Sequence, residues 1–262
     1  MRAGPRWPRA PTFAATSGLR ADRRPRSGAS PLFVRCSTLS APDFVTFERY
    51  PEAMPLFSPP REKSVYHIFT DLAQCVQVSA ETLAESLALE GEGRSSAFDR
   101  LQTHMIDAAE LNHRIANRLA TSLITPFQAD ALHGVAAAMK LCVSEMERTA
   151  DLTQRLNVGR LPNRLLEILS IIERASELVV QCAWQLDKPQ QLSGFDEDMR
   201  RLTTHASEHS RTAIVELWDG CTNPSDFAAT ARTREVIAAL ERVLLAFQNL
   251  SRCVDLLRVK DV

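Results

Sequence analysis

The sequence is poor in aromatic residues and in glycine. Aromatic side chains make up 6% of the 262 residues, and only 9 residues are glycine. Aromatic residues are enriched in β-strands, so this composition gives a sheet little support. It favours an all-helical protein.

The sequence also lacks the closely spaced cysteines of a zinc module or a disulfide framework. None of its six cysteines forms a C-x-x-C pair; they are Cys36, Cys75, Cys142, Cys182, Cys221 and Cys253. Such wide spacing fits a reducing cytosol. Four of the six fall on apolar stripes of expected helices, where cysteine usually serves as a small core residue.

No apolar run reaches the ~18–20 residues that a bilayer-spanning helix requires. The strongest candidate, Leu165 to Leu186, is interrupted by Glu167, Glu173, Arg174 and Glu177. We therefore expect that the chain does not cross a membrane. The sequence also contains no nucleophilic triad signature, no glycine-rich phosphate loop and no dinucleotide fingerprint. We predict a non-enzymatic protein and assign no catalytic, cofactor-binding or metal-binding residue and no cofactor.

Acidic residues and lysine are nearly absent from the first 42 residues. This stretch holds eight arginines, no lysine and one acid, Asp22, and so carries a charge of about +7. The formal net charge of the whole chain is −1, which leaves the remainder at about −8. An acidic body of this kind does not favour nucleic-acid binding.

Residues 1–55 form an expected disordered extension, because they are rich in Arg and Pro and show no sustained apolar periodicity. Three explanations stay open. The extension resembles a transit peptide in its Arg and Ser content and its lack of acids. The second explanation is that the extension is a basic arm that binds anionic surfaces. The third is translated sequence upstream of the natural start, with Met54 or a nearby codon as the true beginning.

The chain from about residue 56 onward repeats apolar residues at intervals of three and four, the spacing of helices packed on helices. We expect six helices: residues 61–90, residues 95–123, a third after Thr125–Pro126, a fourth from Pro162, a fifth over 195–218, and a sixth from Asn223–Pro224. In both Thr125–Pro126 and Asn223–Pro224 the first residue is the expected N-cap and the proline the first helical residue, and Gln128 completes a capping box after Thr125.

The sixth helix carries the clearest heptad of the chain. Its apolar members are Val236, Leu240, Val243, Phe247, Leu250, Val254 and Leu257. A strict heptad is either an internal seam of a bundle or a self-association stripe, and the internal seam is the more frequent outcome.

The two cap-and-proline pairs lie 98 positions apart, and the first and fourth helices open at about the same offset. Two successive three-helix units explain this offset, with chance placement of the prolines as the alternative. We therefore predict two consecutive antiparallel three-helix bundles in residues 56–262, one over 56–158 and one over 160–262.

Two groups of histidines and acids could in principle hold a metal ion. Glu110 and His113 form an E-x-x-H pair, and His205, Glu208 and His209 share one face of the fifth helix. If the second and fifth helices met, Glu110, His113, His205 and His209 could ligate zinc or iron. A solvated polar helix face is the simpler interpretation, because a di-iron site needs two such motifs and two further buried glutamates.

The chain from about Met54 to its end resembles the PhoU-like family of Pit accessory proteins, also called phosphate transport regulators. The most specific match is LATSLITPF at Leu119–Phe127. Residues common in the family also occur at His113, His133 and Glu147, and the segment from Arg234 to Lys260 matches the last helix in length and pattern.

The resemblance implies two three-helix bundles, a cytoplasmic location at the inner membrane face, a bacterial source and a Pit-type phosphate transporter as partner. PhoU-type relatives bind metal clusters through E-x-x-x-D motifs, but this sequence lacks the acids. The aligned positions are Met105, Ala109, Lys140, Leu141, Ser144, Thr203, Ser207, Leu245, Gln248 and Asn249. We therefore expect a regulator that works through protein contacts without a metal cluster. The alternatives are the metal-binding protein described above and a bundle that merely forms homo-oligomers.

Overall fold

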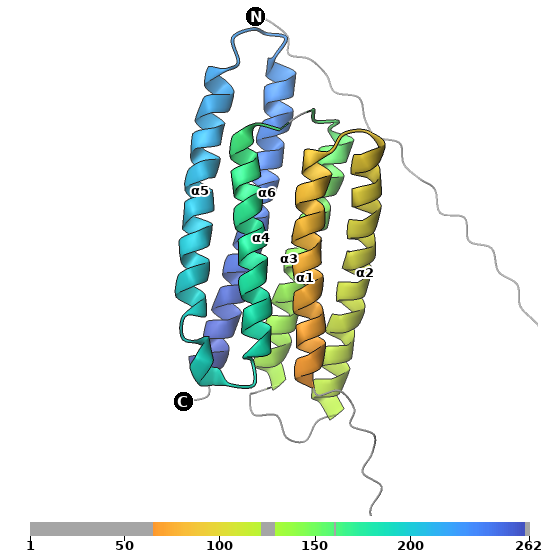
Figure 1. The fold of residues 1–262 in the computed structure, drawn as a ribbon, viewed down its shortest axis with the longest axis vertical. Coiled ribbons are helices and arrows are strands. Elements are labelled where there is room, and N and C mark those ends of the chain that lie inside the picture. Colours follow the sequence, from red (N-terminus) through yellow and green to blue (C-terminus); the bar gives the residue numbers. More distant parts are fainter. Residues whose placement is uncertain (1–64, 122–128, 160, 260–262) are drawn as a thin grey trace, which may run out of the picture. The chain divides into compact units, whose positions relative to one another are not determined.

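The computed structural model describes residues 65–121, 129–159 and 161–259, and these form six α-helices and one short 3₁₀ helix without any strand (Figure 1). The elements are α1 (Val65–Ala88), α2 (Glu92–Thr121), α3 (Ala129–Arg155), α4 (Asn163–Trp184), η1 (Pro189–Leu192), α5 (Phe195–Asp219) and α6 (Phe227–Val259). The all-helical prediction is confirmed. No described helix is both long enough and apolar enough to cross a bilayer.

Tight turns reverse the chain at the helix ends. Gly91 adopts a φ of 59° between α1 and α2, a conformation that costs glycine little. After α3, Asn157 adopts a φ of 47°. The Asn157 N–H donates to the Gln154 carbonyl at 3.0 Å, and the Val158 N–H donates to the Thr153 carbonyl at 3.3 Å. This pair of bonds is a Schellman motif, which satisfies carbonyls that the end of a helix leaves open.

The six helices are arranged so that α2 and α5 lie at opposite edges and the other four lie between them (Figure 1). The helices α1, α2 and α3 all pack on one another, and α5 packs on α4 and α6. The two sets meet through α1 against α4 and α3 against α6, contacts as extensive as those inside each set. The predicted pair of consecutive three-helix bundles is confirmed as the architecture, while the domain boundaries stay a prediction.

The core runs without interruption through both three-helix sets. All seven heptad residues of α6, from Val236 to Leu257, are at most 2% exposed. Phe247 of α6 and Phe69 of α1 are among the largest fully buried side chains. The heptad is therefore an internal seam rather than a self-association stripe.

The expected start of the sixth helix is wrong. It begins at Phe227, and Asn223–Pro224 form a separate turn in which the Asp226 N–H donates to the Asn223 carbonyl at 3.0 Å. The Asn223 amide donates to Thr222 and Asp226, so it does not cap the helix. A proline after asparagine starts a turn as readily as a helix, and here the turn forms.

The fourth helix begins one residue after Pro162, as expected, and ends at Trp184. The expected disorder of residues 1–55 and the Thr125–Pro126 cap with Gln128 lie outside the described residues, as does most of the LATSLITPF motif.

Candidate functional site

The structure does not bring the two predicted metal-binding groups together. Glu110 and His113 lie exposed on α2, and His205 and His209 lie on α5. Because α2 and α5 occupy opposite edges, four helices separate the two groups (Figure 1). Among the residues that the structure describes, no three His, Cys, Asp or Glu side chains converge closely enough to hold a metal ion. The metal-binding alternative is therefore not favoured.

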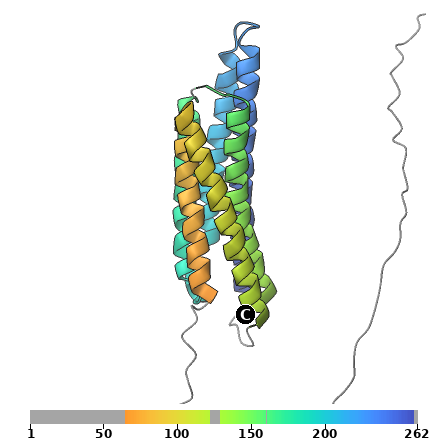
Figure 2. The same cartoon turned by 90° about the vertical axis from the view of Figure 1, so that its right-hand side faces the viewer.

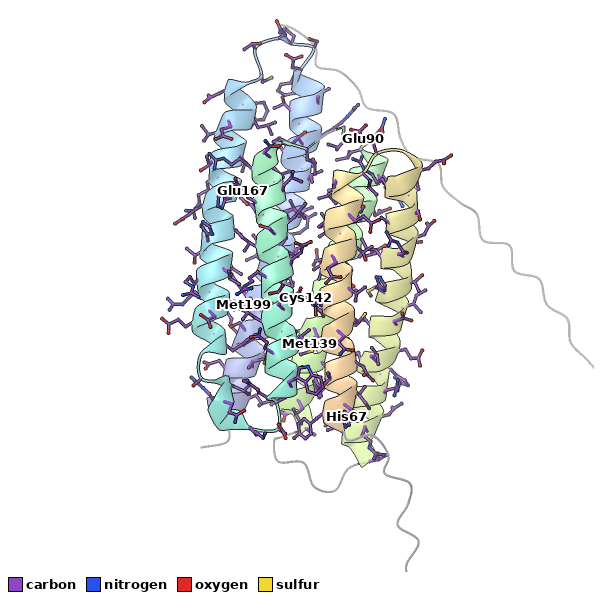
Figure 3. The ribbon with its side chains drawn as sticks, viewed as in Figure 1. His67, Glu90, Met139, Cys142, Glu167 and Met199 are labelled. Atoms are coloured by element: carbon purple, nitrogen blue, oxygen red, sulfur yellow. The ribbon has the colours of Figure 1, made fainter. Side chains whose placement is uncertain are left out.

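The two histidines of α5 instead take part in a short chain of polar contacts with α4. The Nε2 atoms of His205 and His209 are 3.1 Å apart, and His209 Nδ1 lies 2.8 Å from a carboxylate oxygen of Glu167. Figure 3 labels Glu167 on α4. A neutral His209 that donates from Nδ1 to Glu167 accepts at Nε2 from His205. The contact links two neighbouring helices at the surface.

We predict that removal of divalent metals has no effect on this protein. Incubation with EDTA should leave the thermal unfolding midpoint unchanged. A metal ion raises that midpoint only when it is bound to the folded protein, and we expect no bound metal. The comparison is differential scanning calorimetry with and without chelator on protein purified without a metal-affinity step. A lower midpoint in EDTA, with a stoichiometric metal in elemental analysis, would contradict the prediction.

On α2 and α5, the positions aligned with the metal-binding acids of PhoU-type proteins hold side chains that pack on the core or donate hydrogen bonds to their own helix. Met105 is half-buried against the core, and Ala109 beside it is also half-buried. On α5 the hydroxyl of Thr203 donates to the Met199 carbonyl at 3.0 Å, and Ser207 donates to the Thr203 carbonyl at 2.8 Å. These hydroxyls are satisfied by their own helix.

On α3 and α6 the corresponding positions line an outer face that carries apolar and basic side chains. Leu141 is 39% exposed and Leu245 is 59% exposed. Glu145, only 9% exposed, lies 2.6 Å from Arg148 and 3.7 Å from Arg242 across the helix pair. Two guanidinium groups already neutralise this carboxylate, so it is not a free ligand for a cation.

Sequence reasoning did not find Glu145 or Glu167. Each is recognisable only through its partner on another helix, Arg242 for Glu145 and His209 for Glu167. Glu147, which matches the family's glutamate on this helix, is half-buried. Burial raises its pKa, with a further contribution from nearby Asp151.

A cavity of about 370 Å³ opens between α1 and α2, and its walls include Cys75, His104 and Asp107. The Cys75 thiol donates to the His104 carbonyl at 3.3 Å. Burial, with a smaller effect of Asp107, raises the pKa of Cys75 to about 11. Burial lowers the pKa of His104. Cys75 is therefore a protonated thiol near neutral pH, unlike the activated thiolate of a cysteine nucleophile.

We predict that thiol reactivity follows burial. Among the cysteines that the structure describes, iodoacetamide should modify the half-buried Cys221 before Cys142 and Cys182. These two should stay intact in the folded protein, because both are buried and burial raises the pKa of Cys182 to about 12. The Cys75 rate should rise roughly tenfold per pH unit up to about pH 11, as its thiolate fraction grows. Peptide mapping by mass spectrometry measures each site. In urea all sites should react at similar rates, which controls for reagent access.

Solved structures of other proteins share this fold. A Shewanella oneidensis MR-1 protein named as a PhoU-like phosphate regulatory protein aligns with a TM-score of 0.56, at 10% identity over 74% of this chain and 98% of its own. A PhoU-like protein from the same organism aligns with a TM-score of 0.59, at 10% identity over 77% of this chain and 99% of its own. No protein-family model matches the chain, and no curated protein sequence matches it.

The class is therefore defined by architecture: this chain is an all-helical protein with the fold of PhoU-like proteins. The alignments span almost the full length of both Shewanella proteins, so the six-helix unit corresponds to those proteins as a whole.

Proposed function

We propose that the protein is a divergent member of the PhoU-like family that regulates inorganic phosphate transport without enzymatic activity. It would act by contact with a Pit-type transporter at the cytoplasmic face of the membrane. The observation that carries the proposal is the shared fold with a protein named as a phosphate regulatory protein over 98% of that protein's length. The LATSLITPF segment supports the same family.

The chemistry of the helical unit supports contact as the mode of action. The α3–α6 outer face exposes Leu141 and Leu245 where the family carries acids, and its buried carboxylate is paired with two arginines. Exposed apolar side chains beside charges are suited to a protein interface. The thiol at the α1–α2 cavity is protonated near neutral pH, which fits a non-enzymatic role.

Phosphate uptake in a deletion strain tests the proposal. Loss of the protein should change the initial rate of radiolabelled phosphate uptake at high external phosphate, where low-affinity transport dominates, and a plasmid copy should restore it. The full-length protein should also bring down a Pit-type transporter from detergent-solubilised membranes. Unchanged uptake together with no recovered transporter would refute the proposal.

A further inference from the structure

A cluster of large apolar side chains lies exposed where α5 ends and α6 begins. Val215 is 59% exposed, Trp218 41% and Phe227 58%. The rings of Trp218 and Phe227 contact each other with centroids 5.7 Å apart. We call these three residues the aromatic tip. Trp in such clusters often contributes most of the binding energy at protein interfaces.

The aromatic tip stands clear of the rest of the helical unit. The α5–α6 connection extends beyond the ends of the other helices in two perpendicular views (Figure 1, Figure 2). Its backbone is hydrogen-bonded: the Gly220 N–H donates to the Glu216 carbonyl, and the Thr230 N–H donates to the Asp226 carbonyl. Hydrogen bonds therefore hold the backbone around the aromatic tip in place, and the aromatic tip is a projecting surface that is not part of the core.

The segment that carries the aromatic tip is acidic. Residues 212–231 contain three acids, Glu216, Asp219 and Asp226, and neither lysine nor arginine, while Arg211 and Arg232 border this segment. Glu216 is paired with Arg164 of α4 at 3.1 Å. Asp226 accepts hydrogen bonds from the neutral groups of Asn223 and Ser225, which leave its charge in place. The apolar cluster is thus flanked by the uncompensated charges of exposed Asp219 and of Asp226.

We propose that the aromatic tip docks on a Lys/Arg-rich cytoplasmic loop of an integral membrane protein. Short cytoplasmic loops of such proteins carry an excess of Lys and Arg. Asp219 and Asp226 complement that charge, and the face of Trp218 can receive a cationic side chain. A bare membrane surface fits less well, because anionic lipids repel an acidic rim.

This inference rests on the proposed function, since it identifies a surface through which the protein would reach its transporter. The test uses the purified Pit-type transporter of the same organism in zwitterionic nanodiscs, with empty nanodiscs as reference. Binding of the full-length protein is measured by biolayer interferometry at low and high salt. The tip variant is Trp218→Ala with Phe227→Ala, and a charge variant is Asp219→Lys.

A matched control variant carries Trp184→Ala and Leu256→Ala. These side chains are 61% and 57% exposed and lie near the C-terminal ends of α4 and α6, away from the aromatic tip. Because all four side chains are exposed, the variants should retain the wild-type circular dichroism spectrum and unfolding midpoint. This check separates a lost contact from a lost fold.

The expected result is that the tip variant binds about tenfold or more weakly and the control variant binds as wild type. Asp219→Lys should also weaken binding, and wild-type affinity should fall as salt rises. Equal binding by the tip variant and wild type would overturn the docking inference and leave the proposed function standing. Equal binding to empty nanodiscs would assign the aromatic tip to lipid and overturn it too. Failure of every variant and wild type to bind the transporter would overturn the proposed function itself.

Discussion

Replacing Phe247 by alanine should lower the free energy of unfolding by about 3–5 kcal/mol, the cost of truncating a buried aromatic side chain and leaving a cavity. Phe247 is fully buried in α6, the helix that packs on both α3 and α5. The loss is measured by urea denaturation of the full-length protein, followed by circular dichroism at a helix-sensitive wavelength. The urea midpoint should fall without a large change in slope.

The matched control is Leu245→Ala, two residues earlier on the same helix. Leu245 is 59% exposed, and a surface substitution of this kind should change stability by no more than about 0.5 kcal/mol. Equal losses for the two variants would show that the α6 heptad does not form the internal seam.

Replacing Arg94 by methionine should cost about 3 kcal/mol of stability, because it removes the donors that serve several buried carbonyls at once. Arg94 is 5% exposed near the start of α2. Its Nε donates to the Leu89 carbonyl at 3.0 Å and to the Ser86 carbonyl at 3.3 Å, while Nη1 donates to the Val158 carbonyl. One guanidinium therefore ties together the end of α1, the start of α2 and the turn after α3.

The comparison for this variant is Arg100→Met, six residues further along α2. Arg100 pairs with Glu85 at 2.6 Å, but its side chain is 49% exposed, so its loss should cost less than about 1 kcal/mol. Urea midpoints of the two variants give the difference. A small effect at Arg94 would mean that water replaces the guanidinium at these carbonyls.

The helices were predictable because their signals are local in the sequence. The heptad from Val236 to Leu257 is a spacing of apolar residues, and spacing fixes which face is buried. The start of α6 was not predictable, because Asn223–Pro224 suits a turn and a helix start equally. The hydrogen bonds of Asp226 favour the turn.

The candidate site was much less predictable. The sequence located His205 and His209 on one face, but the partner of His209 is Glu167 on a different helix, and no spacing rule connects them. Arg94 gave no signal, since an arginine near a helix start is ordinarily solvated and only the packing of three segments buries it. The aromatic tip was missed because exposure of Trp218 and Phe227 is a property of the fold rather than of their neighbours in sequence.

The meeting of α1 with α4 and of α3 with α6 makes each half of the helical unit a partner for the other. Cleavage of the chain in the connection between Arg155 and Asn163 would produce two fragments, each with a bare apolar flank where its counterpart had packed. Such fragments should behave as a split protein, each insoluble or self-associated alone and helical as a pair when produced together. The same flank offers a route to swapped dimers, in which halves of two chains exchange places.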